Sequence, residues 1–174
     1  MQIRPIRFQD RSSIAKLYRL VSGTVRGISR RPEEITETWI FSLINKPEKD
    51  LVGIVATVED EEGDERIVAV AHAERNELAC YSHILQDFTI IVHPDHQGTG
   101  VGRQLGFNFL MHISKNYSDI KRLEMVVRKE LMHHNTYVKA GFKLEAEVEG
   151  RIRNADGSFS DSMMLVWINP NYKP

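Results

Sequence analysis

Residues 88–103 read FTIIVHPDHQGTGVGR and contain the clearest structural pattern in the chain. Its first five residues are mostly apolar, which predicts a strand covered on both faces, and His93-Pro94 ends that strand. Three glycines then alternate with other residues. Beyond them, apolar residues recur every four positions, as on one face of a helix, at Val101, Leu105, Phe109 and Ile113. The stretch therefore predicts a strand, a glycine-rich turn and a helix in direct succession.

We call residues 97–103, QGTGVGR, the glycine turn. Its glycines let the backbone approach a ligand, and the first turn of the following helix adds unpaired N–H donors and the positive end of its dipole. The pattern predicts a phosphate or pyrophosphate site, although the same glycines also suit a tight turn that binds nothing. The spacing matches neither G-x-G-x-x-G nor G-x-x-x-x-G-K-[ST], so a nucleotide-phosphate binder is a more distant alternative.

The rest of the chain alternates between strand and helix patterns. β-Branched residues flank an acidic run at residues 59–65, which predicts a hairpin with a solvated turn. About seven strands are expected, at residues 3–8, 51–58, 67–73, 88–92, 123–127, 142–148 and 163–168. About four helices are expected, from Asp10 as N-cap to Val21 and at residues 32–45, 101–116 and 131–140. This order indicates a mixed α/β domain.

The composition suits one domain that spans residues 1–174. Of its 174 residues, 41% are hydrophobic, and 23 Lys and Arg balance 24 Asp and Glu for a formal net charge of -1. A chain without a net positive charge attracts the phosphate backbone of nucleic acid poorly, so no nucleic-acid partner is expected. Cys80 is the only cysteine, which excludes a disulfide framework, and no apolar run approaches the ~18 residues of a membrane span. We expect a cytoplasmic protein with no membrane partner.

Two motifs resemble those of the GNAT superfamily of N-acetyltransferases. Residues 92–102, VHPDHQGTGVG, are similar to the family's acetyl-CoA motif, V-x-P and then [QR]-x-x-G-x-[GA], with Gln97, Gly100 and Gly102 at the defining positions. Residues 137–142, YVKAGF, are similar to the family's Y-x-K-x-G-F. The opening Ile3-Arg4-Pro5 with Asp10, and the late Asp156-Gly157 hairpin, also resemble family patterns. The likeness covers almost the whole chain.

The resemblance implies a fold and a cofactor site. The fold is a mixed, mostly antiparallel sheet of about seven strands, whose central strands splay apart and hold the pantetheine of acetyl-CoA, with about four flanking helices. The residues implied to bind the cofactor are Ile90, Ile91 and Val92 along the pantetheine and Gly98, Thr99, Gly100, Val101, Gly102 and Arg103 around the pyrophosphate. Gln97 is either a ligand donor or a turn residue, and Arg103 is either a phosphate contact or a solvent-facing helix residue.

One position departs from the family pattern. The family often places an asparagine seven residues before the motif tyrosine to bind pantetheine, but Glu130 stands there in this sequence. Asn135 lies only two residues before Tyr137 and is the remaining candidate for that contact. Either the helix begins with different chemistry, in which Glu130 or Asn135 makes the contact, or the contact is missing.

Acyl transfer from a thioester to an amine needs a base and an acid. An alkylammonium with a pKa of about 10 has no lone pair for attack until it loses a proton. Tyr137 matches the family tyrosine that protonates the departing CoA thiolate, and its alternative role is that of a core tyrosine at a helix end. Asp87 is the candidate base, with Glu124 as a second and His83 as a weaker candidate. The alternative role of Asp87 and of Glu124 is that of a solvated carboxylate at the end of a strand, with no part in catalysis.

The resemblance therefore implies an N-acetyltransferase that moves an acetyl group from acetyl-CoA directly to a primary amine in a ternary complex. The late hairpin resembles members that act on small molecules or amino acids; a protein N-terminus is the alternative acceptor. A non-catalytic acyl-CoA-binding or sensing module is the rival class. The histidines lack a third ligand at zinc spacing, so no metal is expected at His93, His96, His133 or His134. A monomer or a homodimer is expected.

Overall fold

The computed structural model describes residues 1–22, 30–47, 49–131, 134–154 and 156–173, without the side chains of residues 134 and 135. The strands in these ranges are β1 (Gln2–Pro5), β2 (Leu51–Glu59), β3 (Glu65–Arg75), β4 (Ile84–Val92), β5 (Arg122–Arg128), β6 (Lys143–Arg153) and β7 (Phe159–Ile168). The α-helices are α1 (Arg11–Ser22), α2 (Glu37–Ile44), α3 (Val101–Asn116) and α4 (His134–Lys139). None of these helices has the length and apolar character needed to cross a membrane.

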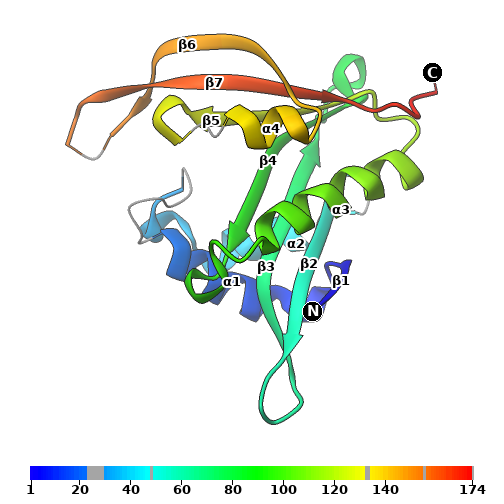
Figure 1. Cartoon of the computed structure of the whole chain (residues 1–174), viewed down its shortest axis with the longest axis vertical. Coiled ribbons are helices and arrows are strands. Elements are labelled where there is room, and N and C mark those ends of the chain that lie inside the picture. The colour runs from blue at the N-terminus through cyan, green and yellow to red at the C-terminus, as the bar shows by residue number, and fades with distance from the viewer. Residues whose placement is uncertain (23–29, 48, 132–133, 155, 174) are drawn as a thin grey trace.

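The strands form one sheet in the order β1-β2-β3-β4-β5-β7-β6. Neighbours are antiparallel except β4 and β5, which are parallel. These two strands pair only at Ile84 with Arg122 and at Leu85 with Leu123, and beyond that point they diverge (Figure 1). The fold expected from the sequence, a mostly antiparallel sheet with splayed central strands, is confirmed.

Helices cover both faces of the β2–β4 part of the sheet, with α3 on one face and α1 and α2 on the other (Figure 1). On the α3 side, Leu105, Phe109 and Ile113 are fully buried, as their four-residue spacing predicts. On the other side, α1 buries Ile14 and Tyr18 in a second cluster. The apolar run of β4 thus lies between two layers of helices.

The start of α3 lies close to β4 because two of its residues lack a Cβ. A Cβ at Gly102 would lie 3.1 Å from Cγ2 of Val92, and one at Gly106 would lie 3.1 Å from Cδ1 of Ile90. Both distances are tighter than ordinary van der Waals contact. These glycines therefore hold the first turns of α3 against the strand that precedes the glycine turn.

Two of the expected helices are shorter in the structure. The pattern at residues 32–45 predicts one helix, but a 3₁₀ turn at Pro32–Glu34 ends at Ile35, where φ is -89° and ψ is 68°. Thr36 then caps α2, since its Oγ1 accepts from the N–H of Trp39 at 3.1 Å. The helix expected at residues 131–140 is likewise the shorter α4, preceded by a 3₁₀ turn at Lys129–Leu131.

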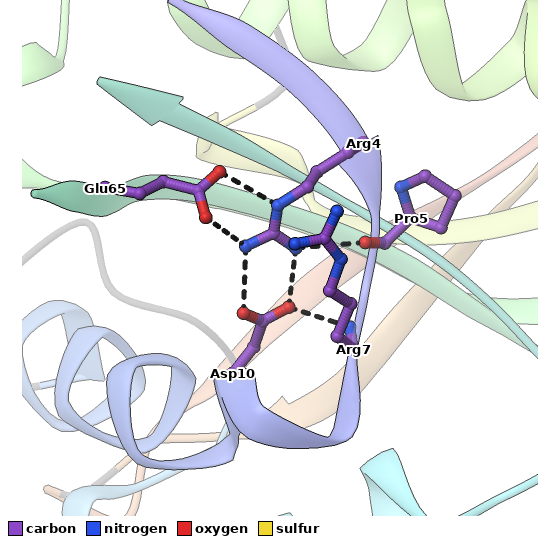
Figure 2. A network of polar contacts seen from close by, with 5 residues as sticks. All are labelled: Arg4, Pro5, Arg7, Asp10 and Glu65. Atoms are coloured by element: carbon purple, nitrogen blue, oxygen red, sulfur yellow. Dashed lines mark hydrogen bonds and ion pairs between the residues drawn. The ribbon is translucent and has the colours of Figure 1, made fainter. Parts of the chain in front are cut away.

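Asp10 has a different partner from the one the sequence predicts. Instead of capping α1, its carboxylate accepts from the N–H of Arg7 at 2.7 Å, within the preceding 3₁₀ turn. The guanidinium of Arg4 donates to both oxygens of Asp10, at 2.8 and 2.9 Å, and also binds Glu65 (Figure 2). This network joins β1, the start of α1 and the start of β3.

Candidate active site

A cavity of about 690 Å³ lies where β4 and β5 diverge. Its walls come from α1, α2, β3, β4, β5 and α4. Six of the residues singled out in the sequence line it: Asp87, Ile90, Ile91, Val92, Gln97 and Tyr137. The fold thus brings together both sequence motifs and the candidate base, which are up to 50 residues apart in the chain.

The edge of β4 that faces β5 has no strand partner beyond Leu85. On its other edge, β4 pairs with β3 as far as Val92. A strand with one unpaired edge can hydrogen-bond an extended, amide-bearing molecule without the help of particular side chains. Ile90, Ile91 and Val92 lie in this unpaired stretch.

The glycine turn lies at one end of that strand edge. Gly98 and Gly100 have φ of 75° and 92°, values that side-chain-bearing L-residues rarely adopt. The first hydrogen bond of α3 runs from the N–H of Gln104 to the carbonyl of Gly100 at 3.0 Å. The N–H groups of residues 101–103 precede it and have no partner within the helix. The turn therefore offers N–H donors and the positive end of the α3 dipole to an anion.

The side chains of the glycine turn have distinct positions. Gln97 lines the cavity, and its Nε2 donates to the carbonyl of Val92 at 3.0 Å, so it closes the turn against the strand. Thr99 bonds the carbonyl of His96 through its hydroxyl at 2.7 Å. Arg103 is exposed and has no ion pair among the described residues. Of these three, only Arg103 leaves a charged group open to a phosphate.

Tyr137 lies on α4, across the cavity from β4, and is half-buried. Its ring packs edge-on against Phe142, with 6.3 Å between ring centroids. Gly141 ends the helix at a φ of 90°, and a Cβ there would lie 3.4 Å from Trp167. The Y-x-K-x-G-F motif thus fixes the tyrosine by local contacts. Burial raises the pKa of Tyr137, so its phenol keeps its proton at neutral pH.

Asp87 lies on a bulge in β4. His72 pairs with Thr89 and Glu74 pairs with Gln86, so two residues of β4 oppose the single Ala73 of β3. Asp87 takes a φ of 55°, the one positive φ among the described non-glycine residues. Such strain is common where a bulge re-aims a side chain at a functional site. Its carboxylate is exposed at the cavity.

The other two candidate bases lie outside the cavity lining. Glu124 forms an ion pair with Arg122 at 2.9 Å. His83 precedes β4, and its carbonyl accepts from the N–H of Lys121 at 2.9 Å. The geometry therefore favours Asp87 among the three.

The pantetheine contact expected near the Y-x-K-x-G-F motif stays a prediction. Glu130 lies outside the cavity lining and is 3.5 Å from Arg128, and the side chain of Asn135 lies outside the described part of the chain. Across the described ranges, no three His, Cys, Asp or Glu side chains gather as a metal site would require. His133 lies outside those ranges, as does the side chain of His134.

Sequence reasoning expected an acceptor pocket from the two early helices, residues 74–83 and the late hairpin, but it assigned no role to the individual side chains of the cavity wall formed by α1, α2 and β3. We call it the acceptor wall and define it by Tyr18 of α1, Trp39 of α2, and His72 and Glu74 of β3, all of which line the cavity. Tyr18 and His72 share a hydrogen bond, and Glu74 forms an ion pair with Lys46. In the sequence, His72 and Glu74 stand out only as polar residues at alternate positions of an otherwise apolar strand, a pattern typical of many half-exposed strands.

The family model described as an acetyltransferase (GNAT) domain matches residues 49–144, more than half of the chain. The chain belongs to the GNAT acetyltransferase family. The resemblance found in the two motifs is therefore confirmed. None of the curated proteins matched this sequence.

Solved GNAT structures share the fold over nearly the whole chain. A ribosomal-protein-alanine N-acetyltransferase from Brucella melitensis has a TM-score of 0.78 at 17% identity, covering 97% of this chain and 99% of its own. A phosphinothricin acetyltransferase from Sinorhizobium meliloti, solved with acetyl-CoA, has a TM-score of 0.76 at 15% identity and coverage of 99% and 90%. A spermidine N-acetyltransferase chimera from Vibrio cholerae and hSSAT gives 0.72 at 20% identity, with coverage of 98% and 96%. At these identities the likeness shows the GNAT fold alone.

Proposed function

We propose that this acetyltransferase uses acetyl-CoA to acetylate a primary amine of a small molecule or amino acid, by direct attack in a ternary complex. The observation that carries the proposal is the cavity between the diverging strands, with the glycine turn at one end and Tyr137 beside it. Membership of the GNAT family supports the same donor. In this reaction acetyl-CoA is the substrate that supplies the thioester.

The donor side fits an elongated diphosphate ester. The N–H groups at the start of α3 suit the diphosphate, because a helix N-terminus and left-handed glycines together favour an anion. The unpaired edge at Ile90–Val92 suits the amides of pantetheine. A Cβ at Gly98 would meet nothing within 4 Å, so this part of the turn is open to a bound molecule.

The acid and the base have separate places at the cavity. Asp87, as general base, takes a proton from the acceptor ammonium directly or through water, which frees the lone pair for attack. Tyr137, as general acid, gives its phenolic proton to the departing thiolate, and its raised pKa keeps that proton in place at neutral pH. Cys80 is exposed and outside the cavity lining, so a route through an acetylated cysteine has no support.

The acceptor end of the cavity carries charges of both signs. Arg30, Glu34, Glu74 and Asp87 all line it. Such a lining favours a small polar amine or an amino acid over an apolar one. The names of three proteins with the same fold refer to the alanine of a ribosomal protein, to spermidine and to phosphinothricin. These give three classes of acceptor to compare. We expect the protein to work in the cytoplasm, as a monomer or homodimer.

The test is thiol release from acetyl-CoA in the presence of three amines: spermidine, phosphinothricin and a peptide that begins with alanine. We expect release above background with phosphinothricin or spermidine. Calorimetry measures acetyl-CoA binding alongside, with ATP as a competitor. Binding without release from any amine would favour the sensing module, release only with the peptide would favour a protein N-terminus, and displacement by ATP as effective as by CoA would favour a nucleotide-phosphate site.

A further inference from the structure

The acceptor wall contains a buried polar pair that the proposed acid and base do not use. Tyr18 is 2% exposed and His72 is 4% exposed, yet both line the cavity. The hydroxyl of Tyr18 and Nε2 of His72 share a hydrogen bond between α1 and β3. Nδ1 of His72 has no partner among the described residues. A buried polar group left unpaired is costly, so this nitrogen needs a partner that the described side chains do not supply.

The pair is held rigidly next to the bulge. His72 lies opposite Thr89, two residues along β4 from Asp87. The ring of Trp39 packs edge-on against Tyr18 with 5.0 Å between centroids, and the guanidinium of Arg30 lies 4.1 Å above Trp39. The tyrosine ring therefore has little freedom to turn away from the cavity.

Both members of the pair are uncharged at neutral pH. Burial lowers the pKa of His72 to about 4; Glu74 raises it in part, while Arg30 and Lys46 lower it further. Burial also raises the pKa of Tyr18. A neutral imidazole has one ring nitrogen that accepts a hydrogen bond, so His72 can accept a hydrogen bond from the Tyr18 hydroxyl.

We propose that the Tyr18 hydroxyl accepts a hydrogen bond from the acceptor nitrogen and that His72 is the positioning residue that orients it. In this arrangement Nε2 of His72 accepts a hydrogen bond from the Tyr18 hydroxyl, so the oxygen lone pairs of Tyr18 are directed to the cavity. An ammonium group has only donors, so it needs such an acceptor before Asp87 removes its proton. This inference rests on the proposed N-acetyltransferase function.

The first test is Tyr18→Phe, which removes the hydroxyl and keeps the ring that packs on Trp39. The probes are spermidine, phosphinothricin and the alanine peptide. For whichever of these amines the wild type acetylates, we expect the KM to rise about tenfold or more, because loss of a hydrogen bond to a charged group typically weakens binding by that factor. The KM for acetyl-CoA should stay the same. Tyr81→Phe is the matched control, because Tyr81 is exposed and outside the cavity lining.

The second test separates orientation from packing. His72→Leu removes the partner of the phenol, and we expect an acceptor KM raised several-fold with acetyl-CoA binding intact. His72→Gln keeps an oxygen that can accept a hydrogen bond from the phenol and should bring the acceptor KM back to within about threefold of wild type. Nitrogen-15 NMR of wild type should show Nε2 of His72 without a bonded proton. Equal losses in the two variants, or a proton on Nε2, would overturn the inference.

The outcomes distinguish this inference from the function on which it rests. An unchanged acceptor KM in Tyr18→Phe, with normal thiol release, overturns the role of Tyr18 and leaves the acetyltransferase intact. Binding of acetyl-CoA by wild type with no thiol release from any of the three amines overturns both. If Tyr18→Phe does not fold, the two His72 variants and the NMR measurement decide.

Discussion

At the scale of single residues, the proposed chemistry uses two proton-carrying groups in different surroundings. Tyr137 is half-buried on α4, and its pKa is raised by burial alone. Asp87 is exposed on a strained bulge and lines the cavity. An acid that keeps its proton and a base that is open to the acceptor are the two groups that acyl transfer to an amine requires.

Tyr137→Phe should lower kcat about 100-fold with the best acceptor, because loss of a general acid typically costs a factor of 10² to 10⁴. The ring and its contact with Phe142 are retained. The dissociation constant of acetyl-CoA, measured by calorimetry, should therefore change little. Full turnover in this variant would remove the assigned role.

Asp87→Asn should reduce the rate most at low pH and least at high pH. At high pH a growing fraction of the acceptor amine has already lost its proton, so a base matters less. The measurement is kcat/KM from pH 6 to pH 10 in wild type and variant. Glu124→Gln serves as the comparison, since Glu124 pairs with Arg122 outside the cavity. A loss that is uniform across the pH range, or a larger loss in Glu124→Gln, would argue against Asp87.

At the scale of elements, the glycine turn has two separable functions. Gly98 and Gly100 supply left-handed backbone, whereas Gly102 and Gly106 let α3 approach β4. A bulky residue at Gly102 would meet Val92 at 3.1 Å and disturb the packing as well as any ligand. Gly98 is the better position for a test, because a Cβ there meets nothing within 4 Å.

Gly98→Ala should weaken acetyl-CoA binding about tenfold or more, because the added methyl group and the strained φ both disturb the anion site. Gly157→Ala is the matched control: its φ is 87°, its Cβ also meets nothing within 4 Å, and it lies in the late hairpin. Each substitution should cost about 1 kcal/mol of stability from the left-handed backbone. Calorimetry compares affinities and urea unfolding compares stabilities. Equal affinities in the two variants would refute the diphosphate site.

At the scale of the whole molecule, the Arg4 network stabilises the half of the sheet that carries the acceptor wall (Figure 2). Arg4→Met leaves the nearly buried carboxylate of Asp10 without its cation, which should lower the free energy of unfolding by about 3 kcal/mol. Arg19→Met is the control, because its partner Glu37 is 75% exposed and such surface pairs contribute below about 1 kcal/mol. Urea unfolding at pH 7 measures both. Equal losses would contradict the network's role.

The same network predicts a pH dependence. Arg4 holds the pKa of Glu65 at about 2 in the folded protein, below its ordinary value of 4.5. Because the pKa of Glu65 is lower in the folded than in the unfolded protein, its ion pair with Arg4 contributes fully to stability above pH 4.5. That contribution is lost as the pH falls toward 2. Because the side chain of Glu65 is 40% exposed, the Arg4–Glu65 ion pair should contribute less than about 1 kcal/mol to the free energy of unfolding. The stability difference between wild type and Glu65→Gln should therefore shrink between pH 7 and pH 3, and a constant difference would contradict the assignment.

Local sequence determined much of this protein. The glycine turn, the stripe of α3 and the β2–β3 hairpin follow from neighbouring residues, since φ preference, caps and apolar spacing act over a few positions. Where local signals competed, the prediction was wrong: Thr36 caps a new helix inside the pattern at residues 32–45, and Asp10 bonds Arg7 and Arg4 instead of capping α1.

The residues that surround the cavity are brought together by long-range contacts, which the sequence does not reveal. The divergence of β4 from β5, the bulge at Asp87 and the pairing of Tyr18 with His72 each depend on strands and helices that are distant in the chain. Tyr18 and His72 are 54 residues apart, and neither lies in a recognisable motif. Register and packing bring such residues together, and both are properties of the assembled sheet that no short stretch of sequence contains.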